Sequence, residues 1–325
     1  LLAYFARYEN RTGLLENVDE KWNLVDWPDN LRDNYDYDRA AQGVNTVLNQ
    51  FYYGALSSSA RLYGYINDTE NAEKTQAKAE RVGRAALETL VEDGTGLFID
   101  AAGSSHSSLH ANALPLMFEL QPGSGNKRIV EFLTKKRIQC GVYFASFLLE
   151  GLYNTGQAQT AYDLITSHDK HSWYTMLEAG ATTCMEAWGP EQKWNTSWCH
   201  PWSSCPIFIV AGELMGLKPK KPGWEEIAFA PKPPANLEWA NISITTPKGA
   251  VKTSFEQDDE TIVYRLNIPE QSRAEVALFN IRPEVFVDGK KYTCTKDADE
   301  LGGIRFSIPF KLKPGEHTIK ATKSF

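Results

Sequence analysis

The sequence predicts a helical domain followed by an antiparallel β-sandwich, and a change of pattern along the chain supports this fold class. Before about residue 218, apolar residues recur at the three-to-four-residue spacing of helices. After it, short runs alternate apolar and polar residues between turn sequences, which is typical of strands. The 325 residues suffice for one large domain or two. We therefore expect a helical domain over 1–218 and a sandwich over 219–325.

Seven or eight helices are expected in the first block, most of them joined by short turns as in stacked antiparallel pairs. The segment 43–66 has one apolar stripe at helical spacing, formed by Val44, Val47, Leu48, Phe51 and Ala55. An alanine-rich helix is expected over 75–91, before the turn "EDGTG". Further helices are expected over 141–156, 159–167 and 205–217.

Roughly seven to nine short strands are expected in the second block, which favours a β-sandwich. The proline-rich segment 218–234, "KPKKPGWEEIAFAPKPP", is expected to be a connector before the first strand. The strand-like segments after it are 239–256, 261–269, 274–280, 284–294 and 317–322. The sequences "PKG", "QDDE", "VDGK" and "KPGE" are the expected turns.

Charge and cysteine content exclude several classes of partner. A net charge of −7 argues against nucleic acid and anionic membrane surfaces, because both attract clustered lysine and arginine. No run of eighteen apolar residues occurs, so we expect no membrane span. The cysteines have neither a CxxC pair nor zinc-ligand spacing, so mostly buried thiols are expected rather than a disulfide framework or a metal site. They are Cys140, Cys184, Cys199, Cys205 and Cys294.

The beginning of the chain indicates a piece of a longer protein. Residues 1–13, "LLAYFARYENRTG", are typical of the end of an amphipathic helix rather than of a targeting segment, and no methionine precedes them. Four Asn-x-Ser/Thr triplets are compatible with a secreted, periplasmic or cell-surface location. They begin at Asn10, Asn67, Asn195 and Asn241.

The stretch 180–202, "GATTCMEAWGPEQKWNTSWCHPW", contains four of the nine tryptophans together with Glu186, Glu191 and His200. Sugars present apolar C–H faces and hydroxyl edges, so their sites combine aromatic rings with carboxylates. A single tryptophan here is readily explained as a core residue packed between helices. The whole cluster, interrupted by glycine and proline, favours a sugar site.

Glu186 is the candidate acid–base group of this stretch. A glutamate is usually a solvated surface group, but Met185 and Trp188 beside it suggest an apolar setting. Such a setting is expected to raise the pKa of the carboxyl group, which suits proton transfer. His200 has two interpretations, a structural histidine or a hydrogen-bonding partner of a sugar hydroxyl.

Several segments, in this order, resemble the α-L-rhamnosidases of glycoside hydrolase family 78. They are "LVDWPDNLRD", "SLHANALPLMFEL", "GATTCMEAW", "SWCHPWSSCPIFIVAGELMGL" and "PGWEEIAFAPKPPANLEWANISITTPKGAVKTSF". The resemblance runs from about residue 20 to the end of the chain. It implies an (α/α)6 barrel with a C-terminal β-sandwich and an inverting hydrolysis that needs two carboxylates. The spacings of histidine and aspartate offer no metal-ligand set apart from the pattern at Asp33, Asp36 and Asp38, so we expect no metal and no cofactor. The implied substrates are rhamnose-capped plant glycans and glycosides.

The resemblance also implies roles for individual residues. Glu186 matches the general base of the family. The implied substrate contacts are Asp26, Trp27, Trp173, Trp188 and His200. Cys184 and Met185 replace the bulkier residues that the family usually has before the base.

One departure concerns the general acid. In the family it lies in an Arg-Asp-Glu-type motif upstream of the Asp-Trp loop, and no such motif precedes "LVDWP" here. The expected helices are also fewer than the twelve of a full barrel. We therefore expect the chain to be the C-terminal part of a longer enzyme, with the acid in its N-terminal remainder.

Three alternatives remain open from the sequence. The chain could be a non-catalytic sugar-binding or structural piece, or another (α/α)6 glycosidase. A polysaccharide lyase would need arginines near its base, and 180–202 contains none.

A calcium loop at Asp33, Asp36 and Asp38 lacks the required glycine and distal glutamate, so a solvated loop is expected there.

Overall fold

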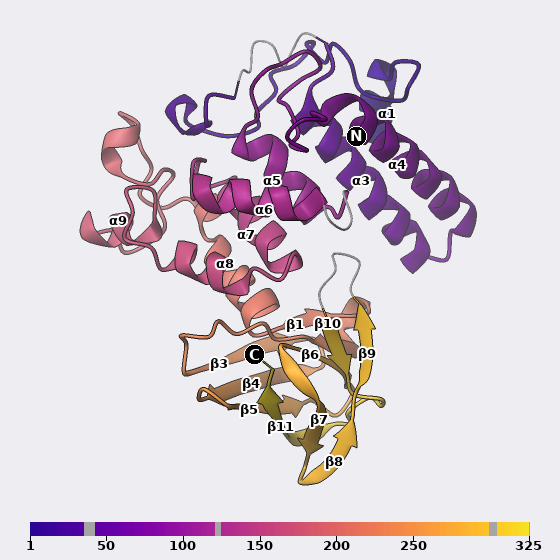
Figure 1. The fold of residues 1–325 in the computed structure, drawn as a ribbon, viewed down its shortest axis with the longest axis vertical. Helices are drawn as coiled ribbons and strands as arrows, with labels where there is room; N and C mark the ends of the chain where they lie inside the picture. The colour runs from indigo at the N-terminus through magenta and orange to yellow at the C-terminus, as the bar shows by residue number, and fades with distance from the viewer. Residues whose placement is uncertain (36–42, 121–124, 299–303, 325) are drawn as a thin grey trace. The chain divides into compact units, whose positions relative to one another are not determined.

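The computed structural model describes residues 1–35, 43–120, 125–298 and 304–324 (Figure 1). The chain forms two compact units, one of residues 1–155 and 163–204, the other of 156–162 and 205–325. Helices precede strands along the chain, as predicted. The boundary that we predicted at residue 218 remains a prediction. Within the described ranges, no helix combines the length and apolarity needed to cross a membrane.

Six helices of eight or more residues form most of the helical part of the described chain: α3 (Thr46–Tyr65), α4 (Thr69–Leu90), α5 (Leu109–Met117), α6 (Gly125–Lys136), α7 (Ala145–Asn154) and α8 (Ala158–Ile165). The shorter α-helices are α1 (Leu2–Phe5), α9 (Trp173–Glu178) and α10 (Cys205–Ile209). Single 3-10 turns are η1 (Ala6–Tyr8), η2 (Asp29–Leu31), η3 (Pro190–Gln192), η4 (Pro201–Ser203) and η6 (Pro222–Trp224), and η5 (Val210–Leu214) is a π-helical turn.

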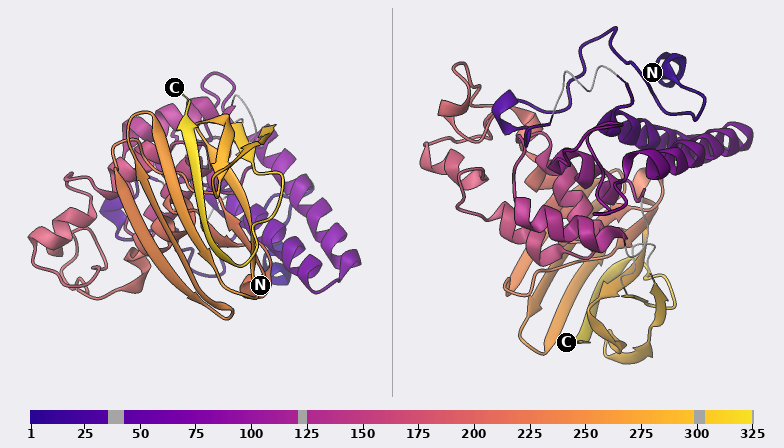
Figure 2. Two further views of the ribbon diagram at one scale, coloured as in Figure 1. Left: turned by 90° about the horizontal axis from the view of Figure 1, so that it is seen from below. Right: turned by 45° about the horizontal axis from the view of Figure 1, so that its top comes forward.

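The longest helices, α3 and α4, lie side by side (Figure 2). Each begins at a side chain that accepts a hydrogen bond from the first turn: Asn45 from the Leu48 N–H, and Asp68 from the Asn71 N–H. Small buried residues of α4, Ala79 among them, allow the two helices to approach closely. These two helices form one of the expected antiparallel pairs, and each begins directly after a capping residue, Asn45 or Asp68.

The apolar stripe predicted for α3 is only partly correct. Val47 is fully buried, but Ala55 is exposed. The helix instead buries polar residues: Asn49 Oδ1 accepts from the Leu15 N–H at 2.7 Å, and Gln50 Nε2 donates to the Ala111 carbonyl at 2.7 Å. These side chains form hydrogen bonds with buried backbone groups of neighbouring segments. Hydrophobicity alone therefore does not determine which residues of α3 are buried.

The strands form two sheets. The five-stranded sheet has the order β1-β2-β6-β10-β9, and the six-stranded sheet has the order β3-β4-β5-β11-β7-β8. Neighbouring strands are antiparallel except β2 and β6, which are parallel. The strands are β1 (Leu217–Pro219), β2 (Glu226–Phe229), β3 (Trp239–Thr246), β4 (Gly249–Gln257), β5 (Thr261–Ile268), β6 (Arg273–Phe279), β7 (Ile281–Val287), β8 (Lys290–Thr293), β9 (Thr295–Ala298), β10 (Ile304–Ser307) and β11 (Gly315–Lys323).

Alternate residues of the strands point into a common core. In β5 the buried residues are Ile262, Tyr264, Leu266 and Ile268. The Tyr264 ring meets the Phe229 ring of the other sheet edge-on, with centroids 5.7 Å apart. The predicted connector 218–234 was wrong in one respect, because β1 ends in it and β2 lies wholly within it, and both belong to the five-stranded sheet. Its prolines flank these short strands.

Gly216 provides a test of this packing. Its φ is +68°, and a Cβ at this position would lie 2.1 Å from the Pro231 nitrogen. Gly216→Ala should therefore add overpacking of about 1–3 kcal/mol to a left-handed backbone strain of about 1–2 kcal/mol. Gly289 (φ +78°) has no atom within 4 Å of such a Cβ, so Gly289→Ala should show the strain alone. Equal losses of unfolding free energy in denaturant titrations would contradict the packing described for Gly216.

Candidate active site

The segments 183–186 and 197–200 lie side by side, and the first of them carries the candidate base, Glu186. The Glu186 N–H donates to the Ser197 carbonyl at 2.8 Å, and the His200 N–H donates to the Cys184 carbonyl at 2.9 Å. The Thr183 hydroxyl donates to the Trp198 carbonyl. The residues between, 187–196, form a loop that includes η3. We call residues 184–200 the base loop.

The carboxylate of Glu186 is held by groups of its own loop. Lys193 Nζ lies 2.5 Å from Oε1, and the Ser197 N–H donates to Oε2 at 3.0 Å. The side chain of Glu186 is 13% exposed and that of Lys193 is 16% exposed. Both oxygens of the carboxylate therefore have a donor, one of them a cation.

The pKa predicted for Glu186 was wrong in direction. Burial of the carboxyl group does raise its pKa, as the apolar neighbours suggested. The hydrogen bond from Lys193, the Ser197 N–H and the charges of Lys193 and His200 outweigh burial, so the pKa of Glu186 lies below its ordinary value. Glu186 is therefore an ionised carboxylate at neutral pH, a form that accepts a proton.

His200 and Trp202 lie against Glu186. Their rings are 4.3 Å apart, and the Trp202 Nε1–H donates to the Glu186 carbonyl at 3.1 Å. His200 Nδ1 is buried and has no hydrogen-bond partner among the described residues. A buried ring nitrogen without a partner is costly.

Trp188, within the base loop, packs against Trp173. Trp188 is fully buried, and its Nε1–H donates to the Cys140 carbonyl at 2.7 Å. Trp173, at the start of α9, meets it edge-on at 4.8 Å and donates from Nε1 to the Ser203 carbonyl at 2.7 Å. Both indole N–H groups are thus used for structure. The predicted sugar contacts of these two residues remain predictions.

Asp26 and Trp27 belong to a second loop, which precedes η2. Asp26 is fully buried, and its Oδ2 accepts from the Gly141 N–H at 2.7 Å and lies 2.7 Å from Nε2 of the equally buried His110. Its Oδ1 accepts from the Trp27 N–H at 2.9 Å. Trp27 is half-buried, and Trp22 lies edge-on to its ring. The direct sugar contacts predicted for Asp26 and Trp27 also remain predictions.

The segment 140–143 brings the two loops together. Its Cys140 carbonyl binds Trp188, its Gly141 N–H binds Asp26, and the Tyr143 ring lies 5.7 Å from the ring of Trp202. Burial, with the nearby charge of Asp26, raises the pKa of Tyr143. The segment 140–143 thus contacts the loop of Asp26 and Trp27, the base loop with Trp188 and His200, and the Trp202 ring. Trp173 joins this group through its contact with Trp188, and Glu186 through the hydrogen bond that it accepts from Trp202.

Sequence reasoning missed Lys193, Tyr143 and His110 as parts of this arrangement. For His110 there was a signal, since it is a polar residue inside the apolar run "SLHANALPL" and must find a buried partner. Lys193 follows Glu186 by seven residues in an irregular loop, where no periodicity relates them. Tyr143 lay within a predicted helix but precedes α7, which begins at Ala145.

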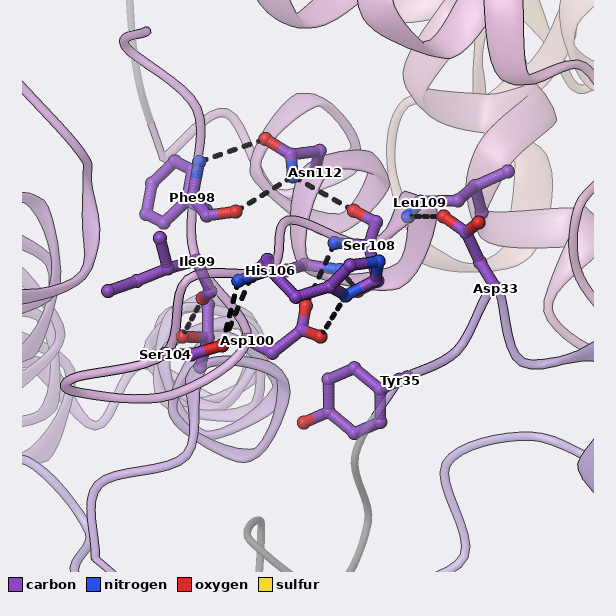
Figure 3. A network of polar contacts seen from close by, with 12 residues as sticks. Asp33, Tyr35, Phe98, Ile99, Asp100, Ser104, His106, Ser108, Leu109 and Asn112 are labelled. Carbon is purple, nitrogen blue, oxygen red and sulfur yellow. Dashed lines mark hydrogen bonds and ion pairs between the residues drawn. The ribbon is translucent and has the colours of Figure 1, made fainter. Parts of the chain in front are cut away.

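A polar network fixes the start of α5, the helix that carries His110 (Figure 3). Asp100 Oδ1 accepts from the Ser108 N–H at 2.8 Å, and its Oδ2 lies 2.6 Å from His106 Nδ1. Asp33 Oδ2 accepts from the Leu109 N–H at 2.7 Å. The two carboxylates satisfy N–H groups at the helix N-terminus, where negative charge is stabilising.

For Asp33 the predicted solvated loop was wrong. Its side chain is 6% exposed, and Lys136 Nζ lies 2.8 Å from its Oδ1. Asp36 and Asp38, the other members of the calcium pattern, lie outside the described residues. Among the residues that are described, no group of three acidic, histidine or cysteine side chains is placed to hold a metal ion.

The sequence matches two domain families, one after the other along the chain. Residues 1–208 match the bacterial α-L-rhamnosidase six-hairpin glycosidase domain, and residues 216–293 match the bacterial α-L-rhamnosidase C-terminal domain. Among curated relatives, an α-L-rhamnosidase of Formosa agariphila is 23% identical over 286 residues, which are 84% of this chain and 30% of that protein. An α-L-rhamnosidase of an Alteromonas species is 19% identical over 73% of the chain and 27% of the relative.

Solved structures show the same fold. The α-L-rhamnosidase of Streptomyces avermitilis, solved in complex with L-rhamnose, aligns with a TM-score of 0.75 at 19% identity, over 98% of this chain and 29% of that one. A family 78 rhamnosidase of a Bacillus species aligns with a TM-score of 0.71 at 24% identity, over 85% of this chain and 30% of that one.

The fold and these matches define a six-hairpin glycosidase domain followed by a C-terminal antiparallel sheet domain. The chain belongs to the bacterial α-L-rhamnosidase family, as its motifs indicated. It spans about 30% of the length of these relatives.

Lys193→Met should raise the pKa of Glu186, because the largest influence that lowers it is removed. A carboxyl group with a lowered pKa stabilises the fold above its unfolded pKa and loses that contribution as pH falls through the folded pKa. The free energy of unfolding of the variant should therefore be lower than that of the wild type at neutral pH. It should also fall less than that of the wild type when the pH is lowered. Carboxyl ¹³C shifts in a glutamate-labelled chain measure the titration directly. Lys193→Arg keeps the charge and should keep the lowered pKa; an unchanged pKa in the methionine variant would contradict the ion pair.

Gly141→Ala should separate the two loops. Its Cβ would lie 2.3 Å from the Trp27 carbonyl oxygen and 2.5 Å from Asp26 Oδ1. We expect an overpacking cost of about 1–3 kcal/mol in denaturant titrations, with altered fluorescence of the site tryptophans. Gly64 in α3 has no atom within 4 Å of an added Cβ, so Gly64→Ala should be neutral or stabilise by about 0.5–1 kcal/mol. Matching results for the two variants would refute the close approach.

Proposed function

We propose that the full-length protein is an inverting glycoside hydrolase that removes terminal α-L-rhamnose from plant-type glycans or glycosides. Glu186 is its general base. The observation that supports this most is the ionised, largely shielded carboxylate of Glu186 beside His200 and Trp202. The family membership supports the class of reaction.

In an inverting reaction the base removes a proton from water while the water attacks the anomeric carbon. A second carboxylic acid protonates the leaving oxygen, and the two carboxyl groups are typically about 6.5–9.5 Å apart, so that water fits between base and sugar. Glu186 suits the first role, because Lys193 and Ser197 hold it ionised and oriented. The acid is expected upstream of this chain, in the N-terminal remainder of the protein.

The surrounding residues are proposed to bind or position the sugar. Trp27 and Trp173 are half-buried and retain ring surface for its C–H face. The partly exposed His200 ring lies beside Glu186, and we assign it to contacting the sugar. Asp26 and Trp188 are fully buried, so we assign them to holding Trp27 and Trp173 in place. A secreted, periplasmic or cell-surface location fits an oligosaccharide substrate.

Glu186→Gln in the full-length protein should abolish turnover of an aryl α-L-rhamnoside, since loss of base catalysis typically costs about 10²–10⁴ in rate. The isosteric amide should leave the fold and rhamnose binding intact. Glu191 is exposed in the same loop, so Glu191→Gln should retain wild-type rates. ¹H NMR of the first product should show β-L-rhamnose. Wild-type rates from Glu186→Gln would end the base assignment, and α-L-rhamnose as first product would end the inverting mechanism.

The 325-residue chain by itself should bind rhamnose weakly and turn over almost none of the rhamnoside. Without the general acid the leaving oxygen departs unprotonated, at a cost of about 10²–10⁴ in rate. Turnover by chain and full-length protein is compared side by side, with rhamnose binding measured by calorimetry. Full activity of the isolated chain would mean that the acid lies within it.

A further inference from the structure

Two of the five cysteines stand on the paired ends of the base loop. Cys184 lies two residues before Glu186, and Cys199 lies one residue before His200. The His200 N–H donates to the Cys184 carbonyl at 2.9 Å, and the Thr183 hydroxyl donates to the Trp198 carbonyl. These bonds set the backbones around the two cysteines side by side, on opposite segments.

The two thiols differ from the other cysteines in their exposure. Cys199 is exposed and Cys184 is partly exposed, whereas Cys140, Cys205 and Cys294 are buried. Burial raises the pKa of Cys184, and the neighbouring Cys199 raises it further. The thiols are thus near enough for their charges to interact, and solvent reaches the outer one.

We propose that Cys184 and Cys199 form a disulfide that closes the base loop when the protein is in an oxidising environment. A disulfide needs a short Cα separation, and the hydrogen bond from the His200 N–H to the Cys184 carbonyl brings the two cysteine-bearing segments together. Such bonds persist in secreted and periplasmic proteins and are rare in cytosolic ones. This proposal rests on the loop geometry and holds whether or not Glu186 is the catalytic base.

The oxidation is a thiol–disulfide exchange with a small disulfide such as oxidised glutathione. The exposed Cys199 thiolate attacks one glutathione sulfur, which forms a mixed disulfide and releases one glutathione thiolate. The Cys184 thiolate then attacks the Cys199 sulfur and releases the second glutathione. One S–S bond forms and one breaks, and the two electrons and two protons of the cysteines end on two glutathione thiols.

The bond would tie together the two ends of a loop of about 15 residues, a size at which a cross-link restricts the unfolded chain substantially. Glu186 and its partner Lys193 both lie inside this loop. Without the disulfide, hydrogen bonds hold the ends of the loop in register, among them those donated by the Glu186 and His200 N–H groups. The disulfide would therefore keep the carboxylate and the histidine in register when the loop fluctuates.

The test uses the 325-residue chain, incubated with oxidised glutathione and then unfolded and alkylated without reductant. Peptide mass spectrometry should find Cys184 joined to Cys199, with the other three cysteines alkylated. Reduction should then make all five cysteines reactive. It should also lower the melting temperature by on the order of 5 °C, since a 15-residue loop loses its cross-link.

Matched variants separate this bond from other thiol chemistry. Cys184→Ser should leave Cys199 reactive towards a maleimide in the folded chain, and Cys294→Ser should keep the cross-link. The double variant Cys184→Ser, Cys199→Ser should melt at the same temperature with and without reductant. Two alkylated thiols at 184 and 199 after oxidation, glutathione retained on Cys199, or a bond from Cys199 to Cys205 would each overturn the proposal.

Discussion

The buried carboxylate of Asp26 joins three parts of the helical unit that are far apart in the sequence. It accepts hydrogen bonds from the Gly141 and Trp27 N–H groups and lies against the buried His110 ring. A carboxylate buried without partners would cost several kcal/mol, so this position is tolerated only with its full set of donors. The Trp27 loop, the start of α5 and the segment 140–143 consequently take their mutual positions from one side chain.

The base loop depends on this arrangement and adds electrostatics of its own. Trp188 anchors it to the Cys140 carbonyl, one residue before the amide that binds Asp26. Inside the loop, Lys193 offsets the effect of burial on Glu186. The result is a carboxylate that stays ionised but has a reduced affinity for a proton. In the role that we propose for it as a base, such a carboxylate relies on orientation and on exclusion of bulk water as much as on its pKa.

Much of the fold was predictable because helix and strand periodicity are local properties. The segments 239–256 and 261–269 alternate and became β3, β4 and β5, and the alanine-rich segment became most of α4. Errors arose where distant groups decide the outcome. Ala55 is exposed because α3 buries polar residues that serve other segments, and Asp33 is buried because Lys136, 103 residues away, neutralises it.

The sequence by itself determined the order of helices and strands and the family, since these follow from residue types at short spacing. It also singled out Glu186 as the candidate base, a role that remains a prediction. Only the tertiary structure decided which charges and amides surround that base. The Asp26–His110 contact spans 84 residues, and the Asp26–Gly141 hydrogen bond spans 115. No local pattern encodes such pairs, because the partners become neighbours only when the chain has folded. The direction of the Glu186 pKa depends on a loop conformation for the same reason.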